Sequence, residues 1–463
     1  RYEDFTINRD SFADFEELVE EMRKENIHLV PIIDGGVKKE DGYDVYEEGK
    51  ENGYFCKDEN GEDFIIGVWP GKCCFPDMLN EKAGEWFGDK YRILIDKGID
   101  GFWNDMNEPA IFYSEKHLKE VFEKMEDYKN MNLDVNTFFE MTGMIGSICN
   151  NPEDYASFYH NYRGKRYRHD QVHKLFGYYM TRSASEAFER YVPEKRILLF
   201  SRASYIGMHR FGGIWQGDNA SWWSHLKMNV KMMPSLNMCG FLYTGADVGG
   251  FGADATEDLV LRWLEFAVFT PLLRNHSARG TRRQEVYRFS HVEKFADVIG
   301  VRYQILPYIY SEYMKAALQN TMMFNPLSFL YGEDALAGQV EDQLFIGENV
   351  MVAPVCEQNV TGRVVYFPER MKQLIFKNGI VEEGKVYEKG FSYVEMPMGT
   401  VHVFLREGYL FPVARGGKCV EDVDFEDLKL YSFGEEIKPY EYYLDDGETK
   451  DFTIESHIRM LSC

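Results

Sequence analysis

The residues from Gly98 to Pro109 bring together side chains that could do chemistry. The run Gly-Ile-Asp-Gly-Phe-Trp-Asn-Asp-Met-Asn-Glu-Pro passes from a short apolar stretch into carboxylates, amides and a tryptophan. Pro109 ends the predicted strand, and the carboxyl end of a strand is where α/β proteins place catalytic side chains. A carboxylate beside an aromatic ring fits sugar hydrolysis, because the carboxylate meets an oxocarbenium-like transition state and the ring covers the apolar sugar face.

Three later segments repeat this pattern of a short apolar run that ends in polar residues. Arg202 and Asp218 each follow such a run, and so do Asp247 and His276 further along the chain. In a barrel of parallel strands all these ends meet at one mouth. The sequence therefore predicts one polar site assembled from several strand ends.

The elements that would position these residues alternate between helix and strand from residue 11 to about 315. The predicted helices cover residues 12–25, 81–97, 170–191, 256–268 and 292–318. The predicted strands cover residues 28–34, 99–104, 196–201, 213–217, 239–244 and 269–274. Strict alternation predicts parallel strands joined by crossover helices, and this many units favour a (β/α)₈ barrel of TIM type. The fold class is α/β.

Two regions depart from the alternation. Residues 114–168 are charged and mixed, with a helix expected over 116–129, and we interpret them as an insertion over the barrel mouth. From residue 320 onward, short strands are separated by Gly, Asp and Pro turns. We therefore predict a catalytic barrel over 1–319, a β-sandwich over 320–414 and a smaller β-domain over 415–463.

Composition narrows the possible partners. The 463 residues are too many for one core, and a net charge of −24 disfavours nucleic acid and anionic membrane surfaces. The eight cysteines form no CxxC pair, and no His/Cys cluster has zinc spacing. We expect no metal, no cofactor and no membrane association, with reduced thiols and a cytoplasmic (bacterial) location.

Several long motifs in order resemble those of one family. They are Trp103–Pro109, Arg202 with Arg210, Trp215–Asn219, Gly245–Phe251 and Arg274–His276. Over essentially its whole length the chain resembles glycoside hydrolase family 31, the α-glucosidases of maltase, isomaltase and sucrase type. It is most similar to the smaller bacterial α-glucosidases of that family.

The resemblance implies a retaining exo-α-glucosidase that removes terminal non-reducing glucose from short α-linked oligosaccharides. Asp105 is implied as the nucleophile and Asp218 as the general acid/base, and a retaining pair sits about 5–5.5 Å apart. The charge of Asp105 should then help to keep Asp218 protonated. Glu108 directly precedes Pro109, and we interpret it as support for the site rather than as the acid.

The resemblance also implies the residues that bind the sugar. Arg202, Asp247 and His276 would bind its hydroxyl groups. The pocket would be walled by Trp69, Trp103, Trp215 and Phe251, with Met106 and Arg274 nearby. Asp34 ends the first predicted strand, and whether it faces the pocket is left open.

The chain departs from the family pattern at its beginning. Family barrels have eight strands, whereas only six are predicted here; the first two strands and the N-terminal β-sandwich are missing. An open barrel would expose strand edges. We therefore expect a C-terminal part of a larger protein, completed by the N-terminal part of the same protein or by another copy. A homo-oligomer is also left open.

Other functions remain open at this point. An α-xylosidase of the same family tends to carry Phe-Gly after the nucleophile, whereas this chain has Met106-Asn107. A transglucosidase differs only at the acceptor site. A catalytically inert sugar-binding fragment is the alternative from another class. Preference for α-1,4 or α-1,6 linkages is set at the +1 subsite, which these motifs do not describe.

Overall fold

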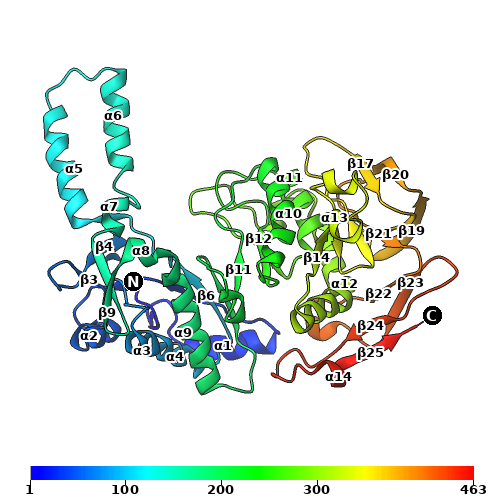
Figure 1. Ribbon diagram of the computed structural model, residues 1–463, viewed down its shortest axis with the longest axis horizontal. Helices are drawn as coiled ribbons and strands as arrows, with labels where there is room; N and C mark the ends of the chain where they lie inside the picture. Colours follow the sequence, from blue (N-terminus) through cyan, green and yellow to red (C-terminus); the bar gives the residue numbers. More distant parts are fainter. Residues whose placement is uncertain (1, 463) are drawn as a thin grey trace. The chain divides into compact units, whose positions relative to one another are not determined.

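The computed structural model describes residues 2–462, the side chain of Glu455 excepted, as two compact units that divide after Gly212. Each unit contains three parallel strands with helices between them (Figure 1). In unit 1 these strands are β1 (Ile32–Asp34), β6 (Gly101–Asp105) and β10 (Leu198–Ser201). β6 lies between the other two, with Asp34 opposite Asp105 and Ser201 opposite Asn104. Their carboxyl ends are therefore level.

The helices of unit 1 precede these strands in the chain. They are α1 (Phe15–Lys24), α3 (Glu81–Lys90), α4 (Arg92–Ile95) and α9 (Phe176–Tyr191). α1 has acidic residues in its first turn and basic residues in its last turn, which suits the helix dipole. α3 begins after Asn80, whose side chain accepts a hydrogen bond from the Lys82 backbone N–H at 3.1 Å.

The segments between β1 and β6, and between β6 and α9, form smaller elements. One antiparallel sheet contains β2 (Val37–Lys38), β5 (Gly71–Cys74), β4 (Ile65–Val68) and β7 (Tyr113–Ser114), in that order. A second contains β3 (Lys57–Asp58), β8 (Phe158–Tyr162) and β9 (Lys165–Arg168). The short helices there are α2 (Asp44–Glu51), α7 (Pro152–Tyr155), α8 (His169–Val172) and η1 (His173–Leu175), whereas η2 (Met208–Arg210) follows β10.

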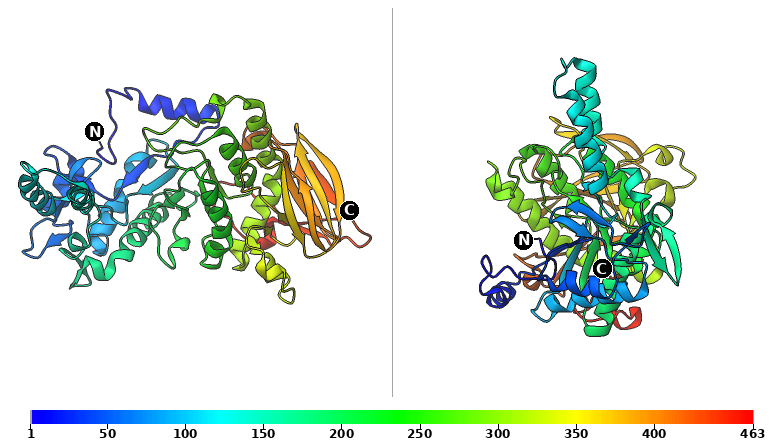
Figure 2. Two further views of the ribbon diagram at one scale, coloured as in Figure 1. Left: turned by 90° about the horizontal axis from the view of Figure 1, so that it is seen from above. Right: turned by 90° about the vertical axis from the view of Figure 1, so that its left-hand side faces the viewer.

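A helical hairpin, α5 (Glu115–Tyr128) and α6 (Val135–Gly146), projects from the rest of unit 1 in two views (Figures 1 and 2). The predicted helix over 116–129 is α5, whereas α6 was not predicted. α6 buries none of its residues, and Phe138 and Phe139 are 58% and 66% exposed. The hairpin contributes little to the core of unit 1.

Unit 2 begins with the strands β11 (Gly213–Trp215), β12 (Thr244–Asp247) and β13 (Leu272–Arg274). The helices α10 (Trp223–Met238), α11 (Glu257–Ala267) and α12 (Val292–Gln319) follow β11, β12 and β13 in turn, and η3 (Val286–Arg288) precedes α12. The predicted strand over 239–244 is wrong for all but its last residue. Residues 239–241 instead close α10, because Gly240 with a φ of 89° permits the turn and the Phe241 N–H bonds back to Leu236 O.

The C-terminal part of unit 2 is almost all β. Its largest sheet runs β14 (Phe324–Pro326), β15 (Leu344–Ile346), β16 (Val350–Val352), β21 (Val401–Arg406), β18 (Met371–Lys377), β19 (Ile380–Tyr387). The paired strands are β17 (Gly362–Phe367) with β20 (Gly390–Glu395), β22 (Leu410–Ala414) with β23 (Leu428–Ser432), and β24 (Tyr440–Tyr443) with β25 (Ile458–Leu461). The short helices are α13 (Leu327–Leu330), η4 (Ala337–Gln339), η5 (Val420–Asp422) and α14 (Ile454–His457).

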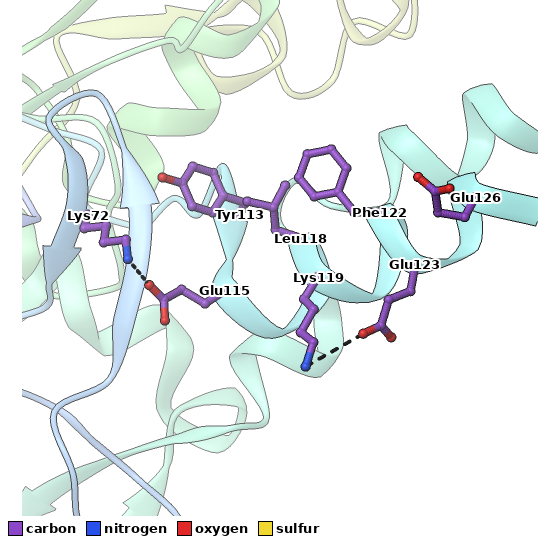
Figure 3. A pocket seen from close by; sticks show the side chains of 8 residues that line it. All are labelled: Lys72, Tyr113, Glu115, Leu118, Lys119, Phe122, Glu123 and Glu126. Carbon is purple, nitrogen blue, oxygen red and sulfur yellow. Dashed lines mark ion pairs between the residues drawn. The ribbon is translucent and has the colours of Figure 1, made fainter. Parts of the chain in front are cut away.

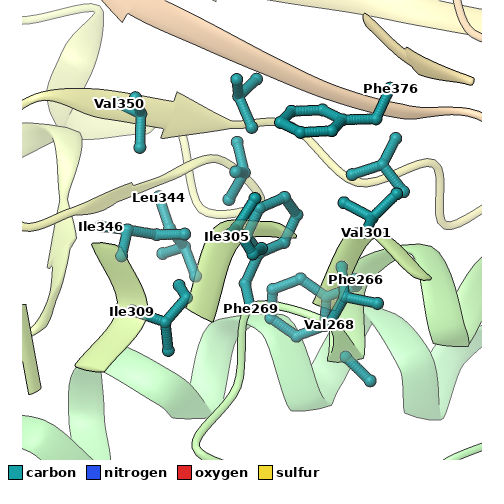
Figure 4. Close-up of a cluster of buried hydrophobic side chains, with 14 of the residues drawn as sticks. Phe266, Val268, Phe269, Val301, Ile305, Ile309, Leu344, Ile346, Val350 and Phe376 are labelled. Carbon is teal, nitrogen blue, oxygen red and sulfur yellow. The ribbon is translucent and has the colours of Figure 1, made fainter. Parts of the chain in front are cut away.

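One continuous core joins the helices of unit 2 to its large sheet. Phe269, Ile305 and Ile309 meet Ile346 and Phe376 there, and all five are buried (Figure 4). Burial of such side chains contributes about 1.5–3 kcal/mol each. The other predicted strands and helices coincide with observed ones, while the domain boundaries near 319 and 414 stay predictions. Within residues 2–462, no helix combines the length and apolar character that a membrane span requires.

Candidate active site

Asp105 is the last residue of β6, at the level carboxyl ends of the three strands of unit 1. Successive strand residues face opposite sides, so Asp105 shares a face with Trp103, and the buried Phe102 and Asn104 share the other. Asp105 O accepts from the Gly35 N–H at 3.1 Å, and Asn104 O accepts from the Arg202 N–H at 3.0 Å. The first three predicted strand ends are therefore adjacent.

Arg202 binds the side chains that follow β6. Its Nε donates to Glu108 Oε1 at 2.7 Å, and its Nη1 lies 3.4 Å from Asp105 Oδ1. The Met106 N–H also donates to Asp105 Oδ1, at 2.8 Å. The guanidinium thus bridges two carboxylates, and a charged donor stabilises the ionised form of Asp105. These contacts of Arg202 were not predicted from the sequence, and its binding to sugar hydroxyls stays a prediction.

Met106 has a backbone conformation that is uncommon for its type. Its φ is 53°, in the left-handed region, and its side chain is buried. A residue held there costs of order 1 kcal/mol or more, and such strain gathers at functional sites. The Arg202 Nη1 contacts the Met106 Sδ at 3.1 Å. The turn after Asp105 is therefore fixed from both its backbone and its side chain.

Asp34 lies opposite Asp105 and belongs to a group of carboxylates. Burial and the charge of Asp105 raise the pKa of Asp34 from 3.8 to about 7, and Arg202 acts in the opposite direction. Asp4 Oδ1 accepts from the Asp34 N–H at 3.4 Å, and burial followed by the charge of Asp34 raises the pKa of Asp4. Asp4 was missed in the sequence because no motif marks it. Whether Asp34 contacts substrate stays open.

The two tryptophans predicted for unit 1 differ in setting. Trp103 is half-buried and stacks on Phe200 at 5.6 Å between ring centroids. Trp69 lies in the turn between β4 and β5, is 55% exposed and meets the edge of Phe112 at 4.9 Å. Trp69 is therefore available to a ligand, whereas Trp103 is held in the sheet.

In unit 2, Asp218 lies on a loop after β11 and is exposed. The next residue, Asn219, anchors this loop: its side chain donates to Asn229 Oδ1 at 3.1 Å and to Asp247 O at 3.3 Å. The Phe251 N–H donates to Asn219 O at 2.7 Å. Asn219 therefore ties the Asp218 loop to the end of β12, a role that its motif did not reveal.

Gly250 permits this close approach of two loops. Its φ is 91°, and a Cβ there would lie 2.5 Å from the Ser221 backbone. Only glycine meets both conditions. Close packing against Ser221 thus explains the second of the two glycines in Asp247-Val-Gly-Gly-Phe251.

Asp247 and Arg274 form an ion pair at the ends of β12 and β13. The Arg274 Nε donates to Asp247 Oδ1, and the Asp247 side chain is fully buried. The Arg274 guanidinium also lies over the ring of Trp215, 4.7 Å from its centroid. Arg274 therefore contacts two other residues predicted for the pocket, and the sugar contacts of all three stay predictions.

His276 follows β13 and stacks on Phe251, with ring centroids 5.1 Å apart and an interplanar angle of 24°. Burial and the charge of Arg274 lower the pKa of His276 from 6.5 to about 4, although the charge of Asp218 acts in the opposite direction. The imidazole is therefore neutral at pH 7. A neutral imidazole can donate one hydrogen bond and accept another, which suits a sugar hydroxyl.

A hollow of about 560 Å³ lies elsewhere in unit 1, along helix α5 of the hairpin (Figure 3). It is lined by Lys72, Tyr113, Glu115, Leu118, Lys119, Phe122, Glu123 and Glu126. Ion pairs join Lys72 to Glu115 and Lys119 to Glu123. None of the predicted site residues lines this hollow.

One group in the described residues has side chains that could hold a metal ion: the buried Cys56, Asp77 and His160. The His160 Nδ1 lies 2.8 Å from Asp77 Oδ1 and 3.5 Å from Cys56 Sγ. Asp77 Oδ2 accepts from the Asn161 N–H at 2.7 Å. Hydrogen bonds thus satisfy these side chains. Their distance along the chain kept them from showing a zinc pattern in the sequence.

Comparison with known families agrees with this arrangement. Residues 1–312 match the TIM-barrel domain of glycosyl hydrolases family 31, and residues 320–411 match the family's C-terminal domain. The chain belongs to glycoside hydrolase family 31. The predicted fold class, a TIM barrel followed by a C-terminal β region, is confirmed.

Its curated relatives include α-glucosidases from several kingdoms. Identity is 31% to α-glucosidase 2 of Bacillus thermoamyloliquefaciens, over 99% of this chain and 54% of that protein. It is 30% to the α-glucosidase of Saccharolobus solfataricus, over 89% and 57%, and 30% to mouse lysosomal α-glucosidase, over 89% and 44%. The chain therefore spans about half the length of the curated relatives it matches.

Solved structures show the same fold. The α subunit of glucosidase II superposes with a TM-score of 0.80 at 23% identity, over 99% of this chain and 46% of that chain. A Flavobacterium johnsoniae dextranase of the family gives 0.76 at 22%, over 94% and 50%. A sulfoquinovosidase of the family from E. rectale gives 0.68 at 22%, over 87% and 54%.

Proposed function

We propose that this chain carries the catalytic residues of a retaining exo-α-glucosidase acting on terminal non-reducing glucose of short α-linked oligosaccharides. Asp105 is the nucleophile and Asp218 the general acid/base. Arg202, Asp247 and His276 bind the hydroxyl groups of the sugar. No cofactor takes part in this mechanism.

The reaction proceeds in two displacements. Asp105 attacks the anomeric carbon while Asp218 gives its proton to the glycosidic oxygen, so the bond to the leaving group breaks and a β-linked glycosyl ester forms. Asp218 then takes a proton from water, and the water oxygen attacks the anomeric carbon. α-Glucose is released and the Asp105 carboxylate is restored.

The observation that carries this proposal is the support of Asp105. A nucleophilic carboxylate must be ionised and fixed in position, and Oδ1 receives both the Met106 N–H and the Arg202 guanidinium. Arg202 is itself held by Glu108 at 2.7 Å. A carboxylate that only capped a turn would not need a charged partner. The α-glucosidases among the relatives support the choice of substrate.

Two alternatives share the same site. An α-xylosidase or a transglucosidase of the family would use the same two aspartates, and Met106-Asn107 after the nucleophile favours glucose over xylose. The dextranase and sulfoquinovosidase resemble this chain in fold alone. A catalytically inert sugar-binding fragment is the remaining alternative.

Hydrolysis of an aryl α-glucoside, measured beside the matching aryl α-xyloside, tests the proposal. The chain should hydrolyse the glucoside, and Asp105→Asn should lower kcat by at least about a thousandfold. Activity that survives Asp105→Asn would disprove the nucleophile assignment. A parent chain that binds glucose without turning over any substrate would favour the inert fragment. Maltose and isomaltose assayed side by side then determine the linkage preference.

A further inference from the structure

Three histidines form a buried chain in unit 1 that the proposed mechanism does not use. His160 Nδ1 lies 2.8 Å from Asp77 Oδ1, and its Nε2 lies 2.8 Å from His169 Nδ1. The Nε2 of His169 lies 2.8 Å from His173 Nδ1. His160 and His169 are 1% and 0% exposed, and His173 is half-buried.

The hydrogen bonds define which nitrogen carries each proton. With an Asp77 carboxyl oxygen as the acceptor, the series requires His160 to donate from Nδ1 and to accept at Nε2. His169 must then donate from Nδ1 and accept at Nε2, and His173 donates from Nδ1. All donors point toward Asp77. Burial and the neighbouring histidines lower the pKa of His169 far below its usual value, which keeps this imidazole neutral.

The histidine chain reaches the turn after Asp105 through one tyrosine. The ring of Tyr155 packs against His173 at 4.9 Å and against His169 at 5.6 Å between centroids. Its hydroxyl lies 3.1 Å from Pro109 O and 2.8 Å from Asn150 Oδ1. Asn150 Oδ1 also accepts from the Ile111 N–H at 2.9 Å.

Pro109 belongs to the turn that positions the proposed nucleophile. Its neighbour Glu108 accepts from Arg202, which contacts Asp105, and the Ala110 N–H bonds back to Met106 O at 3.1 Å. A shift of about 1 Å at a reacting carboxylate can reduce turnover by about a hundredfold. Contacts that fix the position of Pro109 should therefore affect the rate of turnover.

We propose that Asp77, His160, His169 and His173 form a positioning network for the nucleophile turn, which they hold through the Tyr155 hydroxyl shared between Asn150 Oδ1 and Pro109 O. The network touches neither substrate nor reacting atoms, so its members are positioning residues. Its effect on turnover rests on the proposed function, whereas its effect on the turn does not.

A metal ion bound by Cys56, Asp77 and His160 is the competing explanation for one end of the network. The hydrogen-bonded arrangement is favoured because, within residues 2–462, three candidate ligands converge, one fewer than structural zinc takes. The Cys56 thiol also donates to Pro76 O at 3.6 Å, so in this arrangement it has a hydrogen-bond acceptor without any metal.

Hydrogen exchange of the full chain, followed by mass spectrometry, tests the proposal without relying on activity. The reporters are the amides of Ala110 and Ile111. Tyr155→Phe removes one hydroxyl, and His169→Phe removes two hydrogen bonds while keeping a ring. Both should speed exchange at the reporters by about tenfold or more, and the double variant should be no faster than the faster single variant.

His402→Phe is the matched control. His402 is also buried, with partners at 2.9 Å on Gln373 and 2.8 Å on Thr400, but it lies in unit 2. It should cost comparable stability while leaving exchange at the reporters unchanged. If His402→Phe speeds exchange at Ala110 and Ile111 equally, the effect is one of general destabilisation, and the proposal is overturned. No acceleration in Tyr155→Phe would overturn it as well.

Two further measurements separate the remaining explanations. Tyr155→Phe should lower kcat on the aryl α-glucoside several-fold with KM unchanged. If the parent chain shows no hydrolysis, the proposed function is disproved. The hydrogen-exchange result still shows whether the network positions the turn. One zinc per chain by elemental analysis, lost in Cys56→Ser, would overturn the hydrogen-bonded arrangement in favour of a metal site.

Discussion

The carboxyl group of Asp34 should make stability depend on pH in a way that one substitution removes. Its pKa rises from 3.8 to about 7 because of burial and the charge of Asp105. Between pH 4 and 7 the folded chain keeps this proton and the unfolded chain releases it. The contribution of Asp34 to stability is therefore full at low pH and is lost as pH rises to about 7. Asp34→Asn keeps the shape and does not titrate.

The size of the effect follows from the two pKa values. They differ by about 3, and each pKa unit corresponds to about 1.4 kcal/mol, so the ceiling is about 4 kcal/mol. The free energy of unfolding of Asp34→Asn, relative to the parent, should rise by up to this amount between pH 4 and 7. Above pH 7 the difference should stay level.

Urea denaturation followed by tryptophan fluorescence at several pH values measures this difference. Asp10→Asn replaces an exposed carboxyl and serves as the matched control. A difference between Asp34→Asn and the parent that is constant from pH 4 to 8 would refute the reasoning. A difference that falls with rising pH would show that Asp34 is stabilised as the carboxylate instead.

Two further predictions concern unit 2. Arg274→Met should cost about 3–5 kcal/mol in urea denaturation, because it leaves the fully buried Asp247 carboxylate without its ion pair; a loss below about 1 kcal/mol would contradict this. Gly250→Ala should cost about 2–4 kcal/mol, since its φ is 91° and its Cβ would lie 2.5 Å from the Ser221 backbone. Gly252→Ala is the control, because its Cβ would meet nothing within 4 Å, and equal losses in the two glycine variants would disprove the packing argument.

The sequence predicted the parallel strands other than β12, and the polar residues at the strand ends, because both signals are local. Asp105, Asp247 and Arg274 are the last residues of β6, β12 and β13. The register of neighbouring parallel strands brings their carboxyl ends to the same level. A residue that is predicted at a strand end is therefore also predicted to lie near the residues at the neighbouring strand ends. Helix α10 was missed because Pro234 and the buried polar Asn229 interrupt its apolar pattern.

What the sequence did not reveal depends on contacts between distant segments. Arg202 and Glu108 are 94 residues apart, so their hydrogen bond has no sequence signature. The same holds for Asp77 and His160, which are 83 residues apart. A histidine gives no sign in sequence of whether another histidine will be its partner. Such networks follow from the packing of whole elements, after the fold is known.

Two hydrogen bonds between Ile111 and Asn150 close the helical hairpin of unit 1 at its base. The Asn150 N–H donates to Ile111 O at 2.8 Å, and the Ile111 N–H donates to the Asn150 side chain. The residues between Phe122 and Ile145 extend beyond this closure, with α6 adding nothing to the core. Because loop length changes closure entropy only slowly, evolution can lengthen, shorten or replace this arm while the barrel strands keep their register. Changes in the length of this arm should therefore leave the strand ends of unit 1, and the polar side chains on them, in place.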